Sequence, residues 1–325
     1  MTAELLREEV TVVLEPEGYS ISALRVYESL GDVVLGGKVG RAWSVATSLV
    51  VRLGINLSED FLSNFPQLKR IITPTTGVDH IDRKYCDHAG IKVYSLASVK
   101  DEILEITSTA ELSLGLIISL VRNTHLASDA VVRDATWNRD TFKSRQLSNL
   151  TLGVIGFGRI GRMVTGYCLP IFESVLVFDI AVGEGDVLTG ASSHASFSDV
   201  LMTSDVVTLH ANASDGQPPI IGQRELEMMK PGAMLVNTAR GSLVDENALV
   251  DAIQKKRIAG YACDVLQGEP FDDESIRMNP VWKLASEREN IIISPHIGGC
   301  TTDAMDRTEL LMAEYVARLV LEENE

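Results

Sequence analysis

Short runs of Val, Ile and Leu alternate with segments of helical spacing along almost the whole chain, and this alternation restricts the fold more than any other feature. In the first hundred residues the strand candidates are Val10–Leu14, Val33–Leu35, Ser48–Leu53, Lys69–Thr73 and Lys92–Tyr94. Helical spacing separates them, as in Ser58–Phe65 and Ile81–Ala89. Strand and helix in alternation predict a parallel sheet covered by helices on both faces.

A second series of the same kind begins near residue 151. Its six strand candidates are Thr151–Ile155, Ser174–Phe178, Asp205–Leu209, Ala233–Asn237, Ile258–Cys263 and Asn290–Ser294. Between the two series we expect a long helix over Asp101–Thr124 and an irregular polar arm over Leu126–Ser148. A last amphipathic helix is expected over Thr302–Glu325. The chain is long enough for two doubly wound α/β domains.

Composition excludes several classes of partner. The chain has 29 Lys and Arg residues and 45 Asp and Glu residues. Its net charge of −16 disfavours binding to nucleic acid or to an anionic membrane. The longest apolar region, Leu112–Val121, is interrupted by Ser113, Gly115 and Ser119, so no membrane span is expected. The four cysteines form no CxxC pair, which predicts reduced thiols in a cytoplasmic protein and no metal site.

A glycine-rich turn follows the strand candidate Thr151–Ile155 and opens a helix, with the sequence Gly156-Phe157-Gly158-Arg159-Ile160-Gly161. Glycines at this spacing allow a tight turn, close approach of the backbone to a pyrophosphate, and close packing of helix on strand. The next strand ends at Asp179, eighteen residues beyond Gly161. A carboxylate there would bind the ribose hydroxyls of NAD and repel the 2′-phosphate of NADP. The alternative is a plain strand–helix turn with Asp179 as a cap.

Three further segments are expected as loops at the carboxyl ends of strands, namely residues 236–241, 262–270 and 294–299. Together with the glycine turn they resemble the D-isomer-specific 2-hydroxyacid dehydrogenases, the family of 3-phosphoglycerate, glyoxylate/hydroxypyruvate and D-lactate dehydrogenases. The segment from Thr76 to Asp82 looks like the family's substrate-carboxylate loop, and Ser108 to Glu111 like the start of its inter-domain helix. The motifs occur in the family's order over nearly the whole chain.

The resemblance implies a catalytic set of three residues. Arg240 would hold the substrate carboxylate and polarise the carbonyl, because its planar fork suits a carboxylate. His296 would be the acid/base, and Glu269 would hydrogen-bond to it and favour its charged form. Taken singly, each residue also has a structural explanation: Arg240 as a partner of Asp245, Glu269 as a turn residue, His296 as a packing residue.

The resemblance also implies two sets of binding residues. The expected cofactor contacts are Gly156, Gly158, Arg159, Ile160, Gly161, Asp179, His210, Thr238, Ala239, Asp264, Gly298 and Gly299. The expected substrate contacts are Arg52, Thr76, Gly77 and Val78. Thr76 stands where phosphite-specific relatives have lysine, and Glu269 where formate-oxidising relatives have glutamine, so both substrates are disfavoured. The family's His-x-Pro is absent, because Asn212 follows His210-Ala211.

These observations predict a flavodoxin-like substrate domain formed by residues 1–100 and 297–325, and a Rossmann NAD-binding domain formed by residues 101–296. The implied function is an NAD-dependent oxidoreductase that interconverts a small 2-oxo acid and its D-2-hydroxy acid. The alternative is an NAD-sensing regulatory dimer like the corepressors of the same family. A homodimer is expected through residues 101–148, because a long exposed helix with an apolar face needs a partner.

Overall fold

The structure is a computed structural model that describes residues 9–36, 40–182, 193–213 and 216–323. The chain forms two compact units. The first unit consists of Met1–Ile106 and Cys300–Glu325, and the second of Thr107–Gly299. Both divisions fall a few residues later in the chain than the predicted boundaries at residues 101 and 297.

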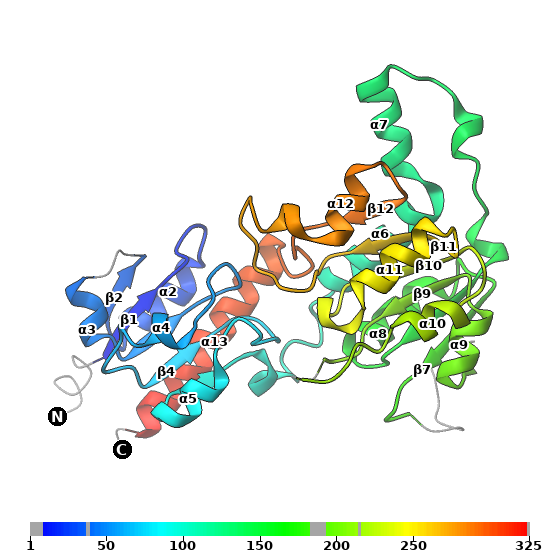
Figure 1. Ribbon diagram of the computed structural model, residues 1–325. Coiled ribbons are helices and arrows are strands. Elements are labelled where there is room, and N and C mark those ends of the chain that lie inside the picture. Colours follow the sequence, from blue (N-terminus) through cyan, green and yellow to red (C-terminus); the bar gives the residue numbers. More distant parts are fainter. Residues whose placement is uncertain (1–8, 37–39, 183–192, 214–215, 324–325) are drawn as a thin grey trace. The chain divides into compact units, whose positions relative to one another are not determined.

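The first unit is built on a five-stranded parallel sheet in the order β2-β1-β3-β4-β5 (Figure 1). Its strands are β1 (Glu9–Val13), β2 (Gly31–Leu35), β3 (Ser48–Val50), β4 (Arg70–Ile72) and β5 (Lys92–Tyr94). Its helices are α2 (Ile21–Glu28), α3 (Arg41–Val45), α4 (Glu59–Leu62), α5 (Arg83–Ala89), the 3-10 helix η2 (Leu96–Val99) and α13 (Thr302–Glu323). This order is that of flavodoxin-like sheets, so the predicted fold of the unit is confirmed.

Two apolar clusters cover the two faces of this sheet. One joins the strands to α2 and α13 through side chains such as Tyr27, Met312 and Val316. The other contains Trp43 stacked on Phe65, with ring centroids 4.5 Å apart. Consecutive apolar residues in the short strands, such as Ile71 and Ile72, supply both clusters, because successive strand residues face opposite sides of a sheet.

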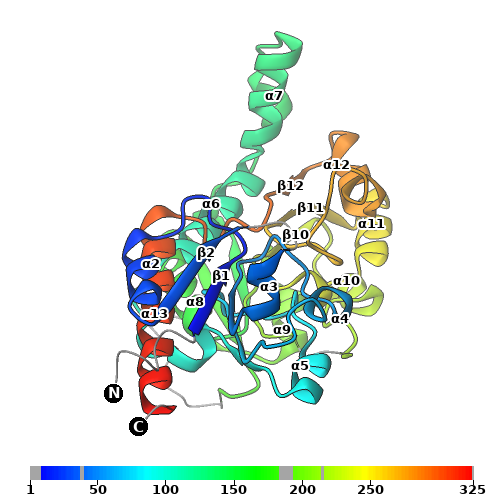
Figure 2. The ribbon, with the colours of Figure 1, turned by 90° about the vertical axis from the view of Figure 1, so that its left-hand side faces the viewer.

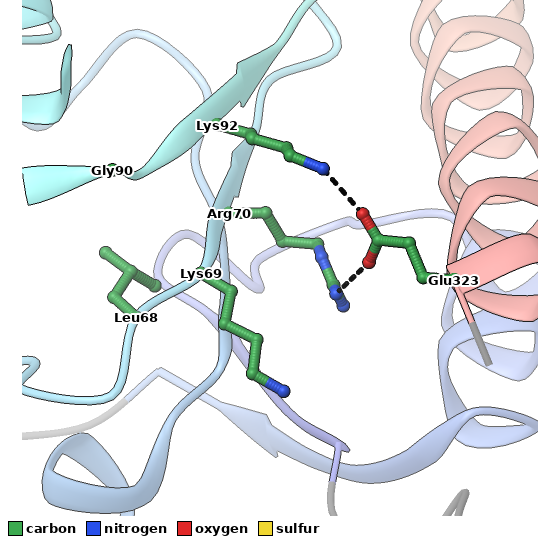
Figure 3. Close-up of a pocket in the computed structure, with 6 residues that line it drawn as sticks. All are labelled: Leu68, Lys69, Arg70, Gly90, Lys92 and Glu323. Atoms are coloured by element: carbon green, nitrogen blue, oxygen red, sulfur yellow. Dashed lines mark hydrogen bonds and ion pairs between the residues drawn. The ribbon is translucent and has the colours of Figure 1, made fainter.

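The end of α13 is attached to the amino ends of β4 and β5 by ion pairs (Figure 3). Glu323 accepts hydrogen bonds from Lys92 Nζ at 2.7 Å and from Arg70 Nη2 at 3.0 Å. Arg70 also donates to Glu9 Oε2 at 2.8 Å. These side chains surround a small pocket of about 260 Å³. The pocket therefore belongs to a structural network at the amino edge of the sheet.

The second unit has a seven-stranded parallel sheet in the order β8-β7-β6-β9-β10-β11-β12. Its strands are β6 (Thr151–Ile155), β7 (Ser174–Phe178), β8 (Ser193–His194), β9 (Val206–Leu209), β10 (Ala233–Asn237), β11 (Ile258–Cys263) and β12 (Ile291–Ile293). This order is that of a Rossmann domain, which confirms the predicted fold. The prediction of six strands was incomplete, since β8 has two residues and is too short for a hydrophobic pattern to reveal.

Helices cover both faces of this sheet (Figure 1). The helices of the second unit are α6 (Ser108–Arg122), α7 (Thr124–Asp134), α8 (Arg159–Cys168), α9 (Phe197–Thr203), α10 (Gln223–Met228), α11 (Glu246–Gln254) and α12 (Pro280–Ser286), with the 3-10 helices η3 (Arg139–Phe142), η4 (Leu147–Asn149), η5 (Gly241–Leu243) and η6 (Ile276–Met278). No helix in the described part of the chain is long and apolar enough to span a bilayer.

The single helix predicted over Asp101–Thr124 is wrong at its start. Residues 101–105 form turns, and α6 begins only at Ser108. Ile103 is 3% exposed and packs into the core of the first unit, so burial in that unit overrides the helical tendency of its neighbours. At the other end, Asn123 adopts a left-handed conformation with φ of 53° and separates α6 from α7.

The irregular arm predicted over Leu126–Ser148 is also wrong in its first half, which is helical. Helix α7 extends away from the rest of the second unit in both views (Figures 1 and 2). None of its residues is buried, and Trp137, just beyond it, is 90% exposed. An ion pair between Asp134 and Arg288 ties its end to the segment after α12.

Candidate active site

The predicted residues of the second unit follow the carboxyl ends of six neighbouring strands. In the spatial order of the sheet, these positions are His296 after β12, Asp264 and Glu269 after β11, Thr238, Ala239 and Arg240 after β10, His210 after β9, the glycine turn after β6 and Asp179 after β7. Ligands of open α/β sheets bind at this edge. The catalytic and cofactor sets are therefore brought to one edge, on adjacent strands.

The glycine turn is packed tightly at two points and open at a third. Gly156 has φ of +94°, and a Cβ there would lie 2.5 Å from the carbonyl carbon of His210. A Cβ at Gly161 would lie 2.0 Å from the carbonyl oxygen of Gly156. By contrast, Gly158 is exposed, has open space beside it and starts α8. The turn thus fits the close approach of a pyrophosphate to a helix N-terminus, as NAD requires.

Asp179 connects the end of β7 to the glycine turn. Its Oδ2 accepts a hydrogen bond from the backbone N–H of Phe157 at 2.6 Å, and its Oδ1 accepts one from Ala181 at 2.8 Å. The carboxylate is half-buried, and each oxygen retains a further lone pair for another donor. Asp179 therefore caps the turn, as the alternative to a cofactor site would have it. Its carboxylate oxygens can still accept hydrogen bonds from ribose hydroxyls.

His296 forms the ion pair that most concerns chemistry. Its Nδ1 lies 3.1 Å from Oε2 of Glu269, and the two side chains are 28% and 26% exposed. With Nδ1 facing the carboxylate, Nε2 is the nitrogen left to exchange a proton with a ligand. Partial exposure allows both side chains to reach solvent and substrate.

The loop that carries His296 is fixed by Asp264, which is 1% exposed. Its carboxylate accepts hydrogen bonds from Ser294 Oγ at 2.5 Å, from Ile297 N at 2.8 Å and from Gly298 N at 2.7 Å. Its carbonyl accepts the N–H of His296 at 2.9 Å. Burial raises the pKa of Asp264, while these hydrogen bonds favour the ionised form. The predicted cofactor contact of Asp264 stays a prediction beside this positioning role.

Arg240 follows β10 in a loop that its own neighbours shape. Asn237 donates from Nδ2 to the carbonyl of Arg240 at 2.8 Å and accepts the N–H of Ala239 at 3.0 Å. The hydroxyl of Thr238 is bound to that of Ser113 on α6 at 2.7 Å. The half-buried Arg240 guanidinium contacts the carbonyl of Ala239 at 2.6 Å. The loop is therefore positioned on both sides by hydrogen bonds that the motif alone does not reveal.

Glu246 is a second positioning residue that the sequence did not reveal. It is 4% exposed, accepts the N–H of Gln267 at 2.7 Å and accepts Nδ2 of Asn279 at 2.7 Å. Gln267 lies two residues before Glu269, so Glu246 fixes the loop that presents that carboxylate. An acid at the start of a helix is an ordinary sequence feature, and only its burial distinguishes this one.

The predicted substrate residues lie in the first unit, after β3 and β4. The backbone N–H groups of Gly77 and Val78 donate to no acceptor within the described residues, which suits a carboxylate ligand. Thr76 is exposed, and Thr75 closes the turn by donating to the carbonyl of Gly77 at 2.7 Å. Arg52 follows β3, and its guanidinium is engaged by protein atoms. Within the described residues, no cluster of His, Cys, Asp or Glu could hold a metal ion.

Residues 114–298 match the model of the NAD binding domain of D-isomer specific 2-hydroxyacid dehydrogenases. The chain is 31% identical over 279 residues to glyoxylate reductase of Thermococcus litoralis, covering 83% of this chain and 78% of that protein. It is 30% identical over 304 residues to D-3-phosphoglycerate dehydrogenase of Methanocaldococcus jannaschii, covering 92% of this chain and 55% of that protein. The chain thus spans about half the length of the phosphoglycerate dehydrogenases that it matches.

Solved structures agree with these matches. D-lactate dehydrogenase from Aquifex aeolicus, complexed with NAD and lactic acid, superposes with a TM-score of 0.80 at 28% identity, covering 97% of this chain and 96% of that chain. The family model covers more than half of this chain, and the glycine turn fits its cofactor. The chain therefore belongs to the D-isomer specific 2-hydroxyacid dehydrogenase family, and its second unit is the NAD-binding domain.

Proposed function

We propose that the protein is an NAD-dependent dehydrogenase that interconverts a small 2-oxo acid and its D-2-hydroxy acid. The observation that carries this proposal is the His296–Glu269 pair, with 3.1 Å between Nδ1 and Oε2, on the sheet edge that also carries the glycine turn. A proton donor beside a bound dinucleotide is what reduction of a carbonyl requires, because the new hydroxyl takes its proton from the enzyme. When bound, the nicotinamide cofactor would give a hydride in its reduced form and take one in its oxidised form.

Each residue then has a defined task. Arg240 holds the substrate carboxylate with its fork and polarises the carbonyl, which stabilises negative charge on the oxygen. His296 gives a proton from Nε2 to that oxygen during reduction and takes it back during oxidation. Glu269 orients the ring through its contact with Nδ1. In the first unit, the backbone N–H groups of Gly77 and Val78 offer donors that suit a carboxylate.

The test is a spectrophotometric assay of NADH consumption with glyoxylate, hydroxypyruvate, pyruvate, phosphonopyruvate and 3-phosphohydroxypyruvate. We expect turnover of at least one of them, lost in His296→Ala and retained in the matched control His88→Ala, which changes an exposed histidine on α5. Binding of NADH without turnover of any 2-oxo acid would overturn the enzymatic proposal and favour the NAD-sensing regulator.

We also propose a homodimer formed through α7 and the segment around Trp137. A helix without a buried residue, followed by a tryptophan that is 90% exposed, is costly to leave in water, and a second copy would cover both. Multi-angle light scattering should give twice the chain mass, and Trp137→Ser should shift the protein towards monomer. A monomeric wild-type protein at micromolar concentration would refute this assembly.

We also propose a location in the reducing cytoplasm, which the four free cysteines support.

A further inference from the structure

The carboxyl edge of the first unit's sheet contains a second ion pair, which bears on the choice of substrate. In the order β2-β1-β3-β4-β5, the order of successive strands reverses between β1 and β3, and ligands of such sheets bind at that point. Arg52 lies there, two residues after β3. Glu15, just after β1, accepts the backbone N–H of Arg52 at 2.6 Å and that of Gly54 at 3.0 Å. The backbone that carries Arg52 is thus fixed at the switch point.

The charge of Arg52 is taken up by Glu309 on α13. Nε and Nη2 of Arg52 donate to Oε1 of Glu309 at 2.8 and 2.5 Å. Nη1 donates to the carbonyl of Glu17 at 3.0 Å, and Nη2 donates also to that of Gly18 at 3.2 Å. The Tyr19 ring lies 5.0 Å from the guanidinium carbon. Most of the fork that could bind an anion therefore points at protein atoms.

The carboxylate of Glu309 accepts three hydrogen bonds from within the first unit. Its Oε2 accepts the N–H of Ser20 at 2.6 Å, and its Oε1 accepts the two bonds from Arg52. Its side chain is 1% exposed, against 18% for Arg52. The three donors around the carboxylate favour its ionised form, while burial raises the pKa of Glu309. A buried carboxylate and a guanidinium at 2.5 Å cancel each other's field over the neighbouring surface.

The surrounding charges do not restore a positive field. Glu15 lies at the same edge, so two carboxylates, those of Glu15 and Glu309, accompany the single guanidinium of Arg52. A phosphate or phosphonate brought to Arg52 would have to displace Glu309, leaving that carboxylate buried without its cation, or would stand beside it and be repelled. An uncharged end of a substrate meets neither penalty.

We propose that Glu309 is a specificity-determining residue which, by neutralising Arg52, restricts the enzyme to 2-oxo acids without a phosphate or phosphonate at the end distant from the carboxylate. The proposal rests on the dehydrogenase function proposed above. It concerns the distal end of the substrate only, because the proposed function assigns the carboxylate to other residues.

The experiment compares kcat/KM for hydroxypyruvate and 3-phosphohydroxypyruvate, which differ only in the phosphate. The wild-type enzyme should prefer hydroxypyruvate by roughly tenfold or more, and Glu309→Gln should raise the relative kcat/KM of the phosphorylated substrate by roughly the same factor. Glu314→Gln is the matched control, since it removes an exposed carboxylate from the same helix. The double variant Glu309→Gln with Arg52→Met should lose the gain, because the gain depends on the freed guanidinium.

A second readout does not depend on turnover. Inorganic phosphate should raise the thermal midpoint of Glu309→Gln more than that of the wild type or of Glu314→Gln. A wild-type enzyme that prefers 3-phosphohydroxypyruvate overturns the inference and leaves the dehydrogenase proposal intact, even if Glu309→Gln fails to fold. An unchanged substrate ratio in a folded Glu309→Gln, or no extra protection by phosphate, overturns it equally. A wild type inactive on every 2-oxo acid refutes the dehydrogenase instead.

Discussion

The carboxyl edges of the two sheets each carry a basic side chain paired with a glutamate, and the two pairs differ in burial. In the second unit His296 and Glu269 are 28% and 26% exposed. In the first unit Glu309 is 1% exposed, and its partner is an arginine. Histidine can lose its charge near neutral pH, whereas arginine cannot. We call His296–Glu269 the open pair and Arg52–Glu309 the closed pair. The open pair is suited to transferring a proton, and the closed pair to holding a charge in one place.

The largest effect on kcat is expected when the histidine of the open pair is replaced by arginine, the basic residue of the closed pair. His296→Arg keeps a cation beside Glu269 but cannot deliver a proton at neutral pH, so kcat should fall by about 10²- to 10⁴-fold. Stopped-flow or steady-state NADH assays measure this, with His88→Arg as the control on an exposed helix position. A loss of less than tenfold would mean that the proton comes from another group.

The next largest effect is expected on the free energy of unfolding, when the closed pair is broken. Glu309→Ala leaves Arg52 without its carboxylate, and the free energy of unfolding should fall by roughly 3 kcal/mol, the lower end for a broken buried pair because Arg52 retains some contact with solvent. Urea unfolding followed by circular dichroism measures the loss. Glu314→Ala, on the exposed side of the same helix, should change it by less than about 0.5 kcal/mol. If Glu309→Ala and Glu314→Ala lost the same free energy of unfolding, the closed pair would not be stabilising the fold.

The two pairs also differ in how far the sequence predicted them. Arg240, Glu269 and His296 were found because each follows a strand in a recognisable local motif, and parallel strands bring such loops to one edge. Glu309 was missed because 257 residues separate it from Arg52, and nothing local marks it as buried. The same reason hid Glu246. Hydrophobic patterns thus predict strands and their ends, whereas pairings between distant polar residues depend on tertiary packing.

Helix boundaries show a related limit. Residues 101–106 have a composition compatible with a helix, but Ile103 is held in the core of the first unit and the segment forms turns. Asn123 ends α6 by adopting the left-handed conformation, which asparagine tolerates better than most residues. A sequence without glycine or proline at that point gives only this weak signal. Strand interiors were therefore predicted more accurately than the connections around α6 and α7.

A histidine ring with an enclosed nitrogen should not exchange a proton in the way proposed for His296, and His210, on the same sheet edge, provides the comparison. Its Nδ1 is enclosed and has no hydrogen-bond partner among the described residues, while its Nε2 lies 3.0 Å from Thr208 Oγ1. Burial lowers the pKa of His210 to about 3. The neutral ring is therefore the native form at every pH at which the enzyme would be assayed.

The consequence is a pH-dependent stability. Below pH 6.5 the unfolded chain binds a proton that native His210 does not bind, so stability present above pH 6.5 is lost as the pH falls towards 3. Between pH 6.5 and 5.5 we expect this group to account for a loss of about 1 kcal/mol. Urea unfolding at both values, for the wild type and His210→Asn, isolates the contribution. An identical slope in the variant would assign the pH dependence to other groups.

The smallest effect is expected where the open pair is tested for stability. Glu269→Gln removes the charge but keeps the shape of a side chain that is 26% exposed, so the free energy of unfolding should change by less than about 1 kcal/mol. The same urea titration as for Glu309→Ala gives a direct comparison, while kcat should fall because the imidazolium loses its partner. If Glu269→Gln destabilised the fold as much as Glu309→Ala, exposure would not be what separates a pair used for chemistry from one used for structure. A small loss of stability joined to a clear loss of kcat would establish that the open pair contributes to the reaction rather than to the fold.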